Sequence, residues 1–284
     1  MAVRVLAPAK INLTLHVTGQ RPDGYHLLDS LVIFGKAADV VQVRDAKILS
    51  LKVEGREAHD VPTGEDNLVL RAARLICKER GAEITLTKNL PVASGIGGGS
   101  ADAAATLRAL SALLNEPLPD RRQVLALGAD VPVCLHKQPV RMQGVGECLS
   151  PTPEMPRNTG MLLVNPRVGL ATPEVFRRLE SRDNPPMPAE IPLFSDASEL
   201  AEWLRCQRND LESAAICLRP VIADVIRSIQ KSGSLIARMS GSGATCFGLY
   251  ASGEDAQLAQ EKIRAAHPDW WTSWFDLAPM PSLS

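Results

Sequence analysis

Alternating apolar and polar positions predict strands in the first part of the chain. The alternation runs through residues 11–17 and again through 39–44, as is typical of half-buried strands. Between them, residues 19–24 combine glycine, proline and aspartate, which is the composition of a turn. A shorter alternation over residues 84–87 predicts one more strand. The chain therefore begins with a β-rich region.

Apolar residues at helical spacing predict the helices. These are expected over residues 67–80, from Ala103 through Leu107 and Leu110 to Leu114, near residues 120–128, and from Pro220 to Gly233. Asp66 is the expected N-cap of the first helix, and Gly81 is its expected stop. Short apolar runs over 235–239 and 245–250 predict two strands around a glycine- and serine-rich loop.

The domain organisation is predicted from length and from one turn-rich segment. A chain of 284 residues suggests about two domains. Residues 151–160 contain four prolines and glycines, so we expect one domain over 1–152 and another over 153–284. A second proline-rich patch, residues 183–188, predicts an exposed loop. Helices and strands occur in both halves without an internal repeat, and the predicted class is α+β.

Composition narrows the classes of function. The chain has 31 basic and 32 acidic residues, so no global field attracts it to nucleic acid or to a membrane surface. No apolar run approaches the roughly 20 residues of a membrane span. The six cysteines form no C-x-x-C pair and the five histidines show no ligand spacing, which favours reduced thiols over disulfides or structural zinc. These features predict a cytoplasmic globular protein.

The most informative segment joins the predicted 84–87 strand to the following helix. It holds four glycines within positions 95–99. Glycine lets backbone approach a ligand closely, and N–H groups at a helix start bind anions, so the segment predicts a phosphate loop. The alternative is a flexible surface turn. The Walker pattern is absent, and Ser100 stands where G-x-G-x-x-G would need its last glycine.

Two charged residues are candidates for chemistry beside such a loop. Phosphoryl transfer needs positioning and charge stabilisation, usually with a base near the attacking hydroxyl and a nearby cation. Lys10 lies between two predicted strands, and Asp130 lies among apolar neighbours after a predicted helix. The alternatives are an exposed lysine at a strand end and an aspartate that caps a helix.

Three ordered motifs together resemble those of the GHMP kinase superfamily. They are Pro8-Ala9-Lys10-Ile11-Asn12-Leu13, the segment from Pro91 to Asp102, and Ser240-Gly241-Ser242-Gly243-Ala244-Thr245. Further segments resemble the superfamily members that phosphorylate a cytidine diphosphate-linked methylerythritol. These segments are Asp23-Gly24-Tyr25-His26, Asp66-Asn67-Leu68, Gly128-Ala129-Asp130-Val131-Pro132 and Gly144-Val145-Gly146-Glu147.

The resemblance implies a two-domain α+β architecture with the active site in the inter-domain cleft. It also implies an ATP-dependent kinase that phosphorylates the 2-hydroxyl of its substrate in the non-mevalonate isoprenoid route. Asp130 would act on that hydroxyl as a base, or orient it, with Lys10 beside it. The loop that wraps the triphosphate would comprise Pro91, Val92, Ala93, Ser94, Gly95, Ile96, Gly97, Gly98, Gly99, Ser100 and Ala101. Magnesium is expected with ATP, and Ser100 is a ligand candidate only by analogy.

Substrate contacts are implied in the same way. Tyr25 would stack on cytosine, His26 would bond its edge, and Phe176 would form a second stacking wall. Polar contacts are expected from Asn12 and Thr172 and from the loop Ser240, Gly241, Ser242 and Gly243. Asn67 and Lys88 are weaker candidates for adenine binding. For Tyr25 and Phe176 the alternative is an apolar anchor or a core position, and for the loop it is a simple hairpin turn.

Some features depart from the resemblance, and other functions stay open. Val92-Ala93-Ser94 and Ala101 replace commoner glycine and serine, although all of them stay small. Within the superfamily, the alternatives are kinases of homoserine, mevalonate or a sugar, which offer no base for Tyr25 to stack on. A different class is a non-catalytic nucleotide- or RNA-binding module, which the neutral charge opposes. We expect a small-molecule substrate, no nucleic-acid or membrane partner, and a monomer or weak homodimer.

Overall fold

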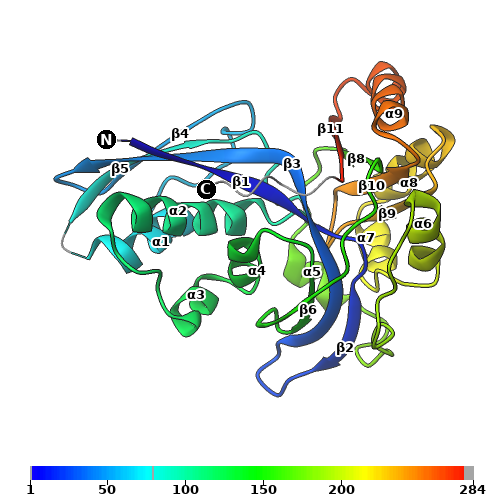
Figure 1. The fold of residues 1–284 in the computed structure, drawn as a ribbon, viewed down its shortest axis with the longest axis horizontal. Helices are drawn as coiled ribbons and strands as arrows, with labels where there is room; N and C mark the ends of the chain where they lie inside the picture. Colours follow the sequence, from blue (N-terminus) through cyan, green and yellow to red (C-terminus); the bar gives the residue numbers. More distant parts are fainter. Residues whose placement is uncertain (1, 79, 278–284) are drawn as a thin grey trace. The chain divides into compact units, whose positions relative to one another are not determined.

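The computed structural model describes residues 2–78 and 80–277 (Figure 1). Contacts within this part of the chain divide it into two compact units, each built from separate segments. Unit 1 comprises the described residues up to Lys10 together with Ala37–Val92 and Gly97–Lys137. Unit 2 comprises Ile11–Lys36, Ala93–Ile96 and the described residues from Gln138 onward.

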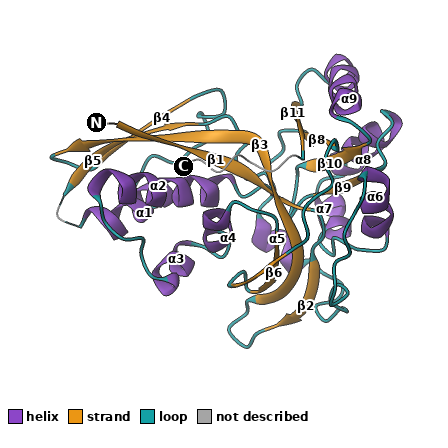
Figure 2. Ribbon diagram, in the orientation of Figure 1, coloured by secondary structure: helices purple, strands orange, loops and turns teal. Residues whose placement is uncertain are grey.

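Unit 1 is a sheet with helices against it. Its elements are β1 (Ala2–Asn12, whose last two residues belong to unit 2), the second half of β3 (His26–Ala46), β4 (Ser50–Glu54), α1 (Leu68–Cys77), β5 (Gly81–Thr87), α2 (Gly98–Leu114), α3 (Arg121–Leu127) and α4 (Val131–His136). The end of β3 pairs antiparallel with β5, and β4 joins β5 in parallel. Helix α1 packs against α2, and α2 against α4 (Figure 2).

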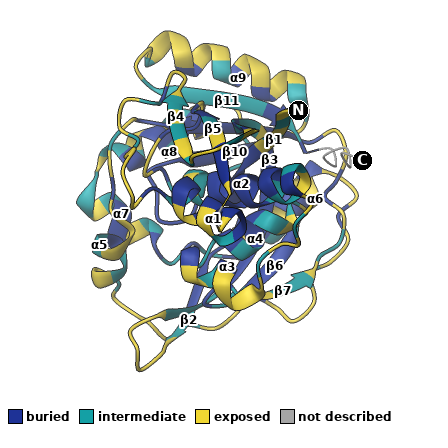
Figure 3. Ribbon diagram, turned by 90° about the vertical axis from the view of Figure 1, so that its left-hand side faces the viewer, coloured by how far each residue is buried: buried dark blue, intermediate teal, exposed yellow. Residues whose placement is uncertain are grey.

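Helix α2 is buried on nearly all sides because its residues are small. Its first half is rich in glycine and alanine, and Ala103, Ala104 and Ala105 are fully buried. A helix that is apolar all round belongs in a core. Figure 3 shows α2 largely buried, whereas α9 (Gly253–Ala266) in unit 2 is mostly exposed. The glycine-rich segment therefore leads into a helix that the core of unit 1 holds in place.

Helix α1 differs from its prediction at both ends. The N-cap is Asn67 rather than Asp66, because the Asn67 side chain accepts a hydrogen bond from Val69 N at 2.8 Å. Asparagine satisfies the free N–H groups of a helix start as well as aspartate does. The helix stops at Cys77 with Lys78 at a φ of 47°, and Gly81 is already the first residue of β5.

Helix α3 confirms its prediction. It runs from Arg121 to Leu127, and Asp120 and Gln123 form a reciprocal capping box at its start. Such a box satisfies two backbone donors at once, which explains why a short helix begins sharply here.

Unit 2 contains a four-stranded antiparallel sheet in the order β11-β8-β10-β9. Its strands and helices are β8 (Gly160–Asn165), α5 (Thr172–Arg177), α6 (Ala197–Arg205), α7 (Glu212–Leu218), α8 (Val221–Lys231), β9 (Ile236–Met239), β10 (Cys246–Tyr250), α9 and β11 (Trp271–Asp276). The strands β9 and β10 and the helix after Pro220 confirm their predictions. One apolar cluster joins the sheet to α7, α8 and α9.

A second group of strands in unit 2 surrounds the first half of β3. These strands are β2 (His16–Gln20), β6 (Val140–Gly144) and β7 (Cys148–Pro151), all in antiparallel pairs. The strand predicted over 11–17 is interrupted, because β1 ends at Asn12 and β2 begins at His16. Between them the backbone changes partners, with Leu13 N bonded to Leu31 O and Leu15 N to Arg208 O.

The boundaries of the two compact units differ from the predicted domain boundary between residues 152 and 153. Residues 11–36 and 138–152 belong to the same unit as the C-terminal part. The physical reason is strand pairing, since β6 pairs with the first half of β3 and β7 pairs with β6. The division into domains over 1–152 and 153–284 remains a prediction. Unit 2 combines segments from both of these ranges.

Two further predictions concern cysteines and membranes. All six cysteines are free thiols, with Cys77, Cys134 and Cys246 buried. Burial raises the pKa of the Cys134 thiol to about 12, so this thiol is protonated at neutral pH. No helix among the described residues has the length and apolar character needed to cross a membrane.

Gly160, at the start of β8, packs closely against Ser252 and Ala256. A Cβ atom placed on Gly160 would overlap the Ser252 carbonyl oxygen and lie 2.9 Å from Ala256 Cβ. We expect Gly160→Ala to lower the free energy of unfolding by about 1–3 kcal/mol in urea denaturation, because the backbone must shift. Gly169→Ala is the matched control, since nothing lies within 4 Å of a Cβ at that position. Equal losses in the two variants would contradict the prediction.

Candidate functional site

The ion pair between Lys10 and Asp130 is the chemical centre of unit 1. Lys10 Nζ lies 2.8 Å from Asp130 Oδ2, and the two side chains are 5% and 35% exposed. The lysine is therefore a buried cation rather than a solvated strand end. Asp130 precedes α4 but its side chain makes no capping hydrogen bond. Both alternatives considered from the sequence are excluded, and the carboxylate keeps a face open to a ligand.

The glycine-rich segment ends against this pair. Gly97 adopts a left-handed φ of 65°, and a Cβ on it would lie 3.1 Å from Lys10 Cβ. Helix α2 starts at Gly98, and its first backbone hydrogen bond runs from Ala101 N to Gly97 O. Helix geometry leaves the N–H groups before Ala101 without intrahelical partners, and these groups together with the helix dipole favour an anion.

The middle of the glycine-rich segment packs in unit 2 against the hairpin loop between β9 and β10. Thr245 N donates to Ser94 O at 3.0 Å, and Ser240 Oγ donates to Gly95 O at 3.2 Å. A Cβ on Gly95 would lie 2.6 Å from Gly243 N, so the two loops meet backbone to backbone. The structure thus brings together two motifs that are far apart in sequence.

Asn12 joins the same loops. Its backbone N donates to Ser240 Oγ at 3.0 Å, and its Nδ2 donates to Ser30 Oγ at 2.7 Å. Its Oδ1 is buried without a hydrogen-bond partner. Thr172 Oγ1 lies 2.8 Å from Ser242 Oγ on the same loop. The predicted polar contacts therefore gather in unit 2, with one acceptor left for a ligand.

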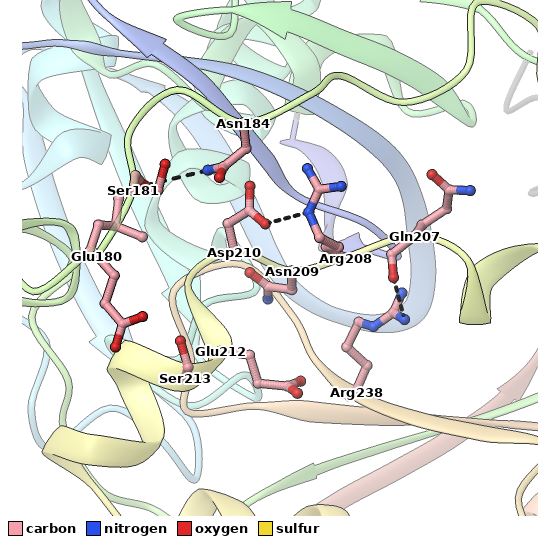
Figure 4. A pocket seen from close by; sticks show the side chains of 11 residues that line it. Glu180, Ser181, Asn184, Gln207, Arg208, Asn209, Asp210, Glu212, Ser213 and Arg238 are labelled. Atoms are coloured by element: carbon pink, nitrogen blue, oxygen red, sulfur yellow. Dashed lines mark hydrogen bonds and ion pairs between the residues drawn. The ribbon is translucent and has the colours of Figure 1, made fainter.

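The support behind the hairpin loop was missed from sequence. Asn209 Nδ2 donates to Met239 O at 2.8 Å and to Gly241 O at 2.9 Å. Glu212 Oε2 accepts from Met239 N at 2.7 Å, and burial raises the pKa of the Glu212 carboxyl. Both side chains line a polar cavity of about 400 Å³ (Figure 4). No motif surrounds these residues in the sequence, so only the fold reveals their role.

The aromatic residues lie around the turn between β2 and β3. Tyr25 is 60% exposed, so it is not an apolar anchor. The His26 ring stacks on Phe176 with a centroid distance of 4.5 Å and an interplanar angle of 26°. Burial, aided by the charge of Arg182, lowers the pKa of His26 and favours the neutral ring at neutral pH. His26 Nε2 is buried without a partner, which leaves a polar atom for a ligand.

The two candidates for adenine binding are engaged elsewhere in unit 1. Lys88 is buried, and its ammonium pairs with Asp39 and Asp102. The Asn67 side chain caps α1 and donates to Pro62 O. Both side chains thus have partners within the protein, and neither contact supports the predicted adenine role.

The described part of the chain holds no preformed metal cluster. Within residues 2–78 and 80–277, no group of three or more His, Cys, Asp or Glu side chains is placed to hold a metal ion. Ser100 lies near the Asp130 turn, since its Oγ would be 4.0 Å from a Cβ on Gly128. The oxygen donors of Ser100 and Asp130 suit magnesium, which keeps several non-protein ligands.

Comparisons with known proteins show which family the chain resembles. The family model of the GHMP kinases N terminal domain matches residues 67–140, and that of the GHMP kinases C terminal matches residues 191–269. A 4-diphosphocytidyl-2-C-methyl-D-erythritol kinase of Ruegeria pomeroyi is 56% identical over 273 residues, or 95% of this chain and 98% of its own. One of Paracoccus denitrificans is 56% identical over 97% of each chain.

Solved structures extend the comparison. A crystal structure of 4-(cytidine 5'-diphospho)-2C-methyl-D-erythritol kinase has a TM-score of 0.76 and 33% identity, covering 95% of this chain and 98% of its own. A homoserine kinase from Cytophaga hutchinsonii has a TM-score of 0.69, covering 97% of this chain and 94% of its own. At 20% identity, the homoserine kinase shares the fold alone.

Removal of one hydroxyl tests the loop contacts. Ser240 Oγ accepts from Asn12 N and donates to Gly95 O, and the residue is fully buried. We expect Ser240→Ala to lower the free energy of unfolding by about 1–3 kcal/mol, because two buried partners lose a hydrogen bond. Ser213→Ala, at an exposed position of α7, is the control and should change little. Indistinguishable urea midpoints for Ser240→Ala and the wild type would refute this.

Proposed function

This chain belongs to the 4-diphosphocytidyl-2-C-methyl-D-erythritol kinase family of GHMP kinases, and we propose that it phosphorylates the 2-hydroxyl of that substrate with ATP. The products are the 2-phosphate and ADP, in the non-mevalonate route to isoprenoid precursors. The observation that carries the proposal is the Lys10–Asp130 ion pair at the end of the glycine-rich segment. This pair is the charge arrangement that transfer of a phosphoryl group to an alcohol needs.

The ion pair has a defined part in the proposed reaction. The Asp130 carboxylate accepts a hydrogen bond from the substrate hydroxyl and takes its proton. The bond between that oxygen and the γ-phosphorus forms as the bond from the γ-phosphorus to the bridging oxygen breaks, and ADP leaves. Lys10 Nζ lies 2.8 Å from Asp130 Oδ2 and holds this side chain in place, and its ammonium stabilises charge on the transferred group.

Residues 91–101 bind the triphosphate in this proposal. The free N–H groups at the start of α2 and the helix dipole supply positive potential without side chains. Magnesium bound with ATP would offset negative charge on the triphosphate. Ser100 and Asp130 are the residues that would hold it through their oxygen atoms.

The cytidine end of the substrate is assigned to unit 2. The exposed Tyr25 ring stacks on the cytosine, and the free His26 Nε2 bonds the edge of the base. The Phe176 ring stacks on the His26 ring, which covers one face of Phe176. Asn12 Oδ1, Thr172 and residues 240–243 contact the diphosphate and erythritol parts. The cytoplasmic location and the monomer or weak homodimer stay predictions.

A coupled ATP-turnover assay tests the proposed function. The acceptors are 4-diphosphocytidyl-2-C-methyl-D-erythritol, mevalonate, homoserine and galactose, each at the same concentration. Release of ADP with the cytidyl acceptor alone supports the proposal. Turnover with another acceptor would keep the kinase chemistry but reject the base-binding assignment, and turnover with none would reject the kinase.

Asp130→Asn tests the chemical step. The variant keeps the shape of the side chain but loses the proton acceptor, so we expect kcat to fall by about 10²–10⁴-fold. Binding of ATP, measured by calorimetry without magnesium, should change little. Asp60→Asn, at a side chain that is 70% exposed, is the matched control and should retain full kcat. A kcat within threefold (roughly 0.65 kcal/mol) of wild type for Asp130→Asn would reject the assigned role.

Tyr25→Ala tests the base-stacking assignment. Stacking of a base on an aromatic ring contributes about 1–3 kcal/mol, so we expect KM for the cytidyl substrate to rise by about 5- to 150-fold. The KM for ATP should stay unchanged. Tyr25→Phe keeps the ring and should restore the wild-type KM. Similar KM values for the alanine and phenylalanine variants would show that the ring does not read the base.

A further inference from the structure

The Asn12 amide has one polar atom without a partner, and Ser30 is the partner of the other. Asn12 lies at the end of β1 and Ser30 lies within β3, and both residues are fully buried in unit 2. Asn12 Nδ2 donates to Ser30 Oγ at 2.7 Å, whereas Asn12 Oδ1 is buried without a hydrogen-bond partner. The proposed reaction gives Ser30 no part, so its contact with Asn12 needs another explanation.

Hydrogen-bond directions fix which end of the Asn12 amide faces Ser30. Ser30 Oγ carries a single proton, and it donates this proton to Thr14 O at 2.5 Å. A carbonyl oxygen only accepts, so Ser30 Oγ has only lone pairs left for Asn12. The reversed amide would place two acceptor oxygens, Thr14 O and Asn12 Oδ1, against one hydroxyl proton. The Asn12 amide therefore turns its nitrogen to Ser30 and its oxygen away from Ser30.

Thr14, which receives the Ser30 proton, is itself held by two further contacts. Thr14 Oγ1 accepts a hydrogen bond from Leu31 N at 2.8 Å and donates to Met187 Sδ at 2.9 Å. Thr14 and Met187 are both buried, and Leu31 follows Ser30 on β3. These bonds tie the backbone that follows Asn12 to β3, so the Thr14 carbonyl stays directed at the Ser30 hydroxyl.

The free oxygen of Asn12 lies beside the hairpin loop between β9 and β10. Asn12 N donates to Ser240 Oγ at 3.0 Å, which holds the residue against this loop. A Cβ on Gly241 would lie 3.2 Å from Asn12 Oδ1, so the glycine keeps that side of the oxygen free of a side chain. A buried acceptor without a partner is costly, and a ligand that donates to it removes the cost. Asn12 thus offers a hydrogen-bond acceptor at the loop.

We infer that Ser30 is a positioning residue for the substrate, because it holds the Asn12 amide with its acceptor oxygen toward the ligand. The inference rests on the proposed function, which assigns Asn12 to the diphosphate and erythritol parts of the substrate. The diphosphate is a diester that has only acceptor oxygens at neutral pH, whereas the methylerythritol part has hydroxyl groups. Asn12 Oδ1 therefore accepts a hydrogen bond from a methylerythritol hydroxyl other than the 2-hydroxyl, which the proposed reaction assigns to Asp130.

Ser30→Ala tests the inference through the kinetics of the two substrates. Removal of the hydroxyl leaves the Asn12 amide free to reverse, so we expect KM for the cytidyl substrate to rise by about three- to tenfold. KM for ATP should stay unchanged. Ser30→Thr keeps a hydroxyl and should retain the wild-type KM values. An unchanged cytidyl KM in Ser30→Ala, or equal rises for both substrates, would overturn the inference.

Ser232→Ala is the matched control, because it removes a hydroxyl with two contacts elsewhere in unit 2. Ser232 Oγ donates to Ile229 O at 2.7 Å and lies 2.7 Å from Tyr250 OH. Its removal should lower the free energy of unfolding without changing either KM. A rise of the cytidyl KM in Ser232→Ala that equals the rise in Ser30→Ala would show a general effect of lost stability and would refute the positioning role.

Deoxy analogues of the substrate identify the hydroxyl. One analogue lacks the 1-hydroxyl and the other lacks the 3-hydroxyl of the methylerythritol part, so each keeps the reacting 2-hydroxyl. In the wild type, loss of the hydroxyl that Asn12 binds should raise KM by about three- to tenfold. In Ser30→Ala the same analogue should cause little further rise, because the hydrogen bond is already lost. Effects of both analogues that are independent of Ser30→Ala would contradict the assigned contact.

Urea denaturation without substrate separates the inference from the proposed function. The losses of stability in Ser30→Ala, Asn12→Ala and the double variant should be non-additive, because the two side chains share one hydrogen bond. Additive losses would reject the role of Ser30. Absence of ADP release by the wild type would instead reject the proposed function and the hydroxyl contact with it, while the urea midpoints still decide whether Ser30 holds Asn12.

Discussion

The cost of burying an ammonium group governs the architecture of unit 1. Lys10 and Lys88 are both buried, and a buried cation is stable only with a carboxylate beside it. Lys10 therefore holds Asp130 in the turn before α4, and Lys88 holds Asp39 and Asp102 on either side of the glycine-rich segment. Lys10 lies near the end of β1 and Lys88 directly follows β5, and α2 starts beside both lysines. The position of the glycine-rich segment follows from these pairings.

In unit 2, close contacts between backbone segments hold the glycine-rich segment in place. Gly95 meets the loop of Ser240 and Gly243 at distances that leave no room for a Cβ atom. Hydrogen bonds from Ser240 Oγ and to Ser94 O lock this contact, and Asn209 and Glu212 hold the hairpin loop from its other side. Small residues in both motifs are thus required by packing as well as by ligand access. A ligand-binding loop that is held in this way loses little entropy when it binds.

Several buried side-chain nitrogen and oxygen atoms have no hydrogen-bond partner. Asn12 Oδ1 and His26 Nε2 are buried without partners, and both belong to residues that the motifs assign to the substrate. A buried polar atom without a partner is costly, and a ligand that bonds it would remove that cost. The side chains of Lys88 and Asn67, in contrast, have partners inside the protein: Lys88 pairs with Asp102, and Asn67 caps α1. Buried atoms without a hydrogen-bond partner also occur away from those residues, at Asp102 Oδ1, Arg108 Nε, Thr152 Oγ1, Thr159 Oγ1 and Ser234 Oγ.

The sequence alone determined the α+β class, the glycine-rich loop before α2, the helix near residues 120–128, and the β9–β10 hairpin. Each of these depends on residues close together in the chain, through periodicity, capping or turn chemistry. Only the tertiary structure decided which residues meet over long distances. It brought Lys10 to Asp130, paired the buried Lys88 with Asp39 and Asp102, and revealed Asn209 behind the hairpin loop. The reason is that burial and pairing depend on neighbours from distant segments, which local patterns do not encode.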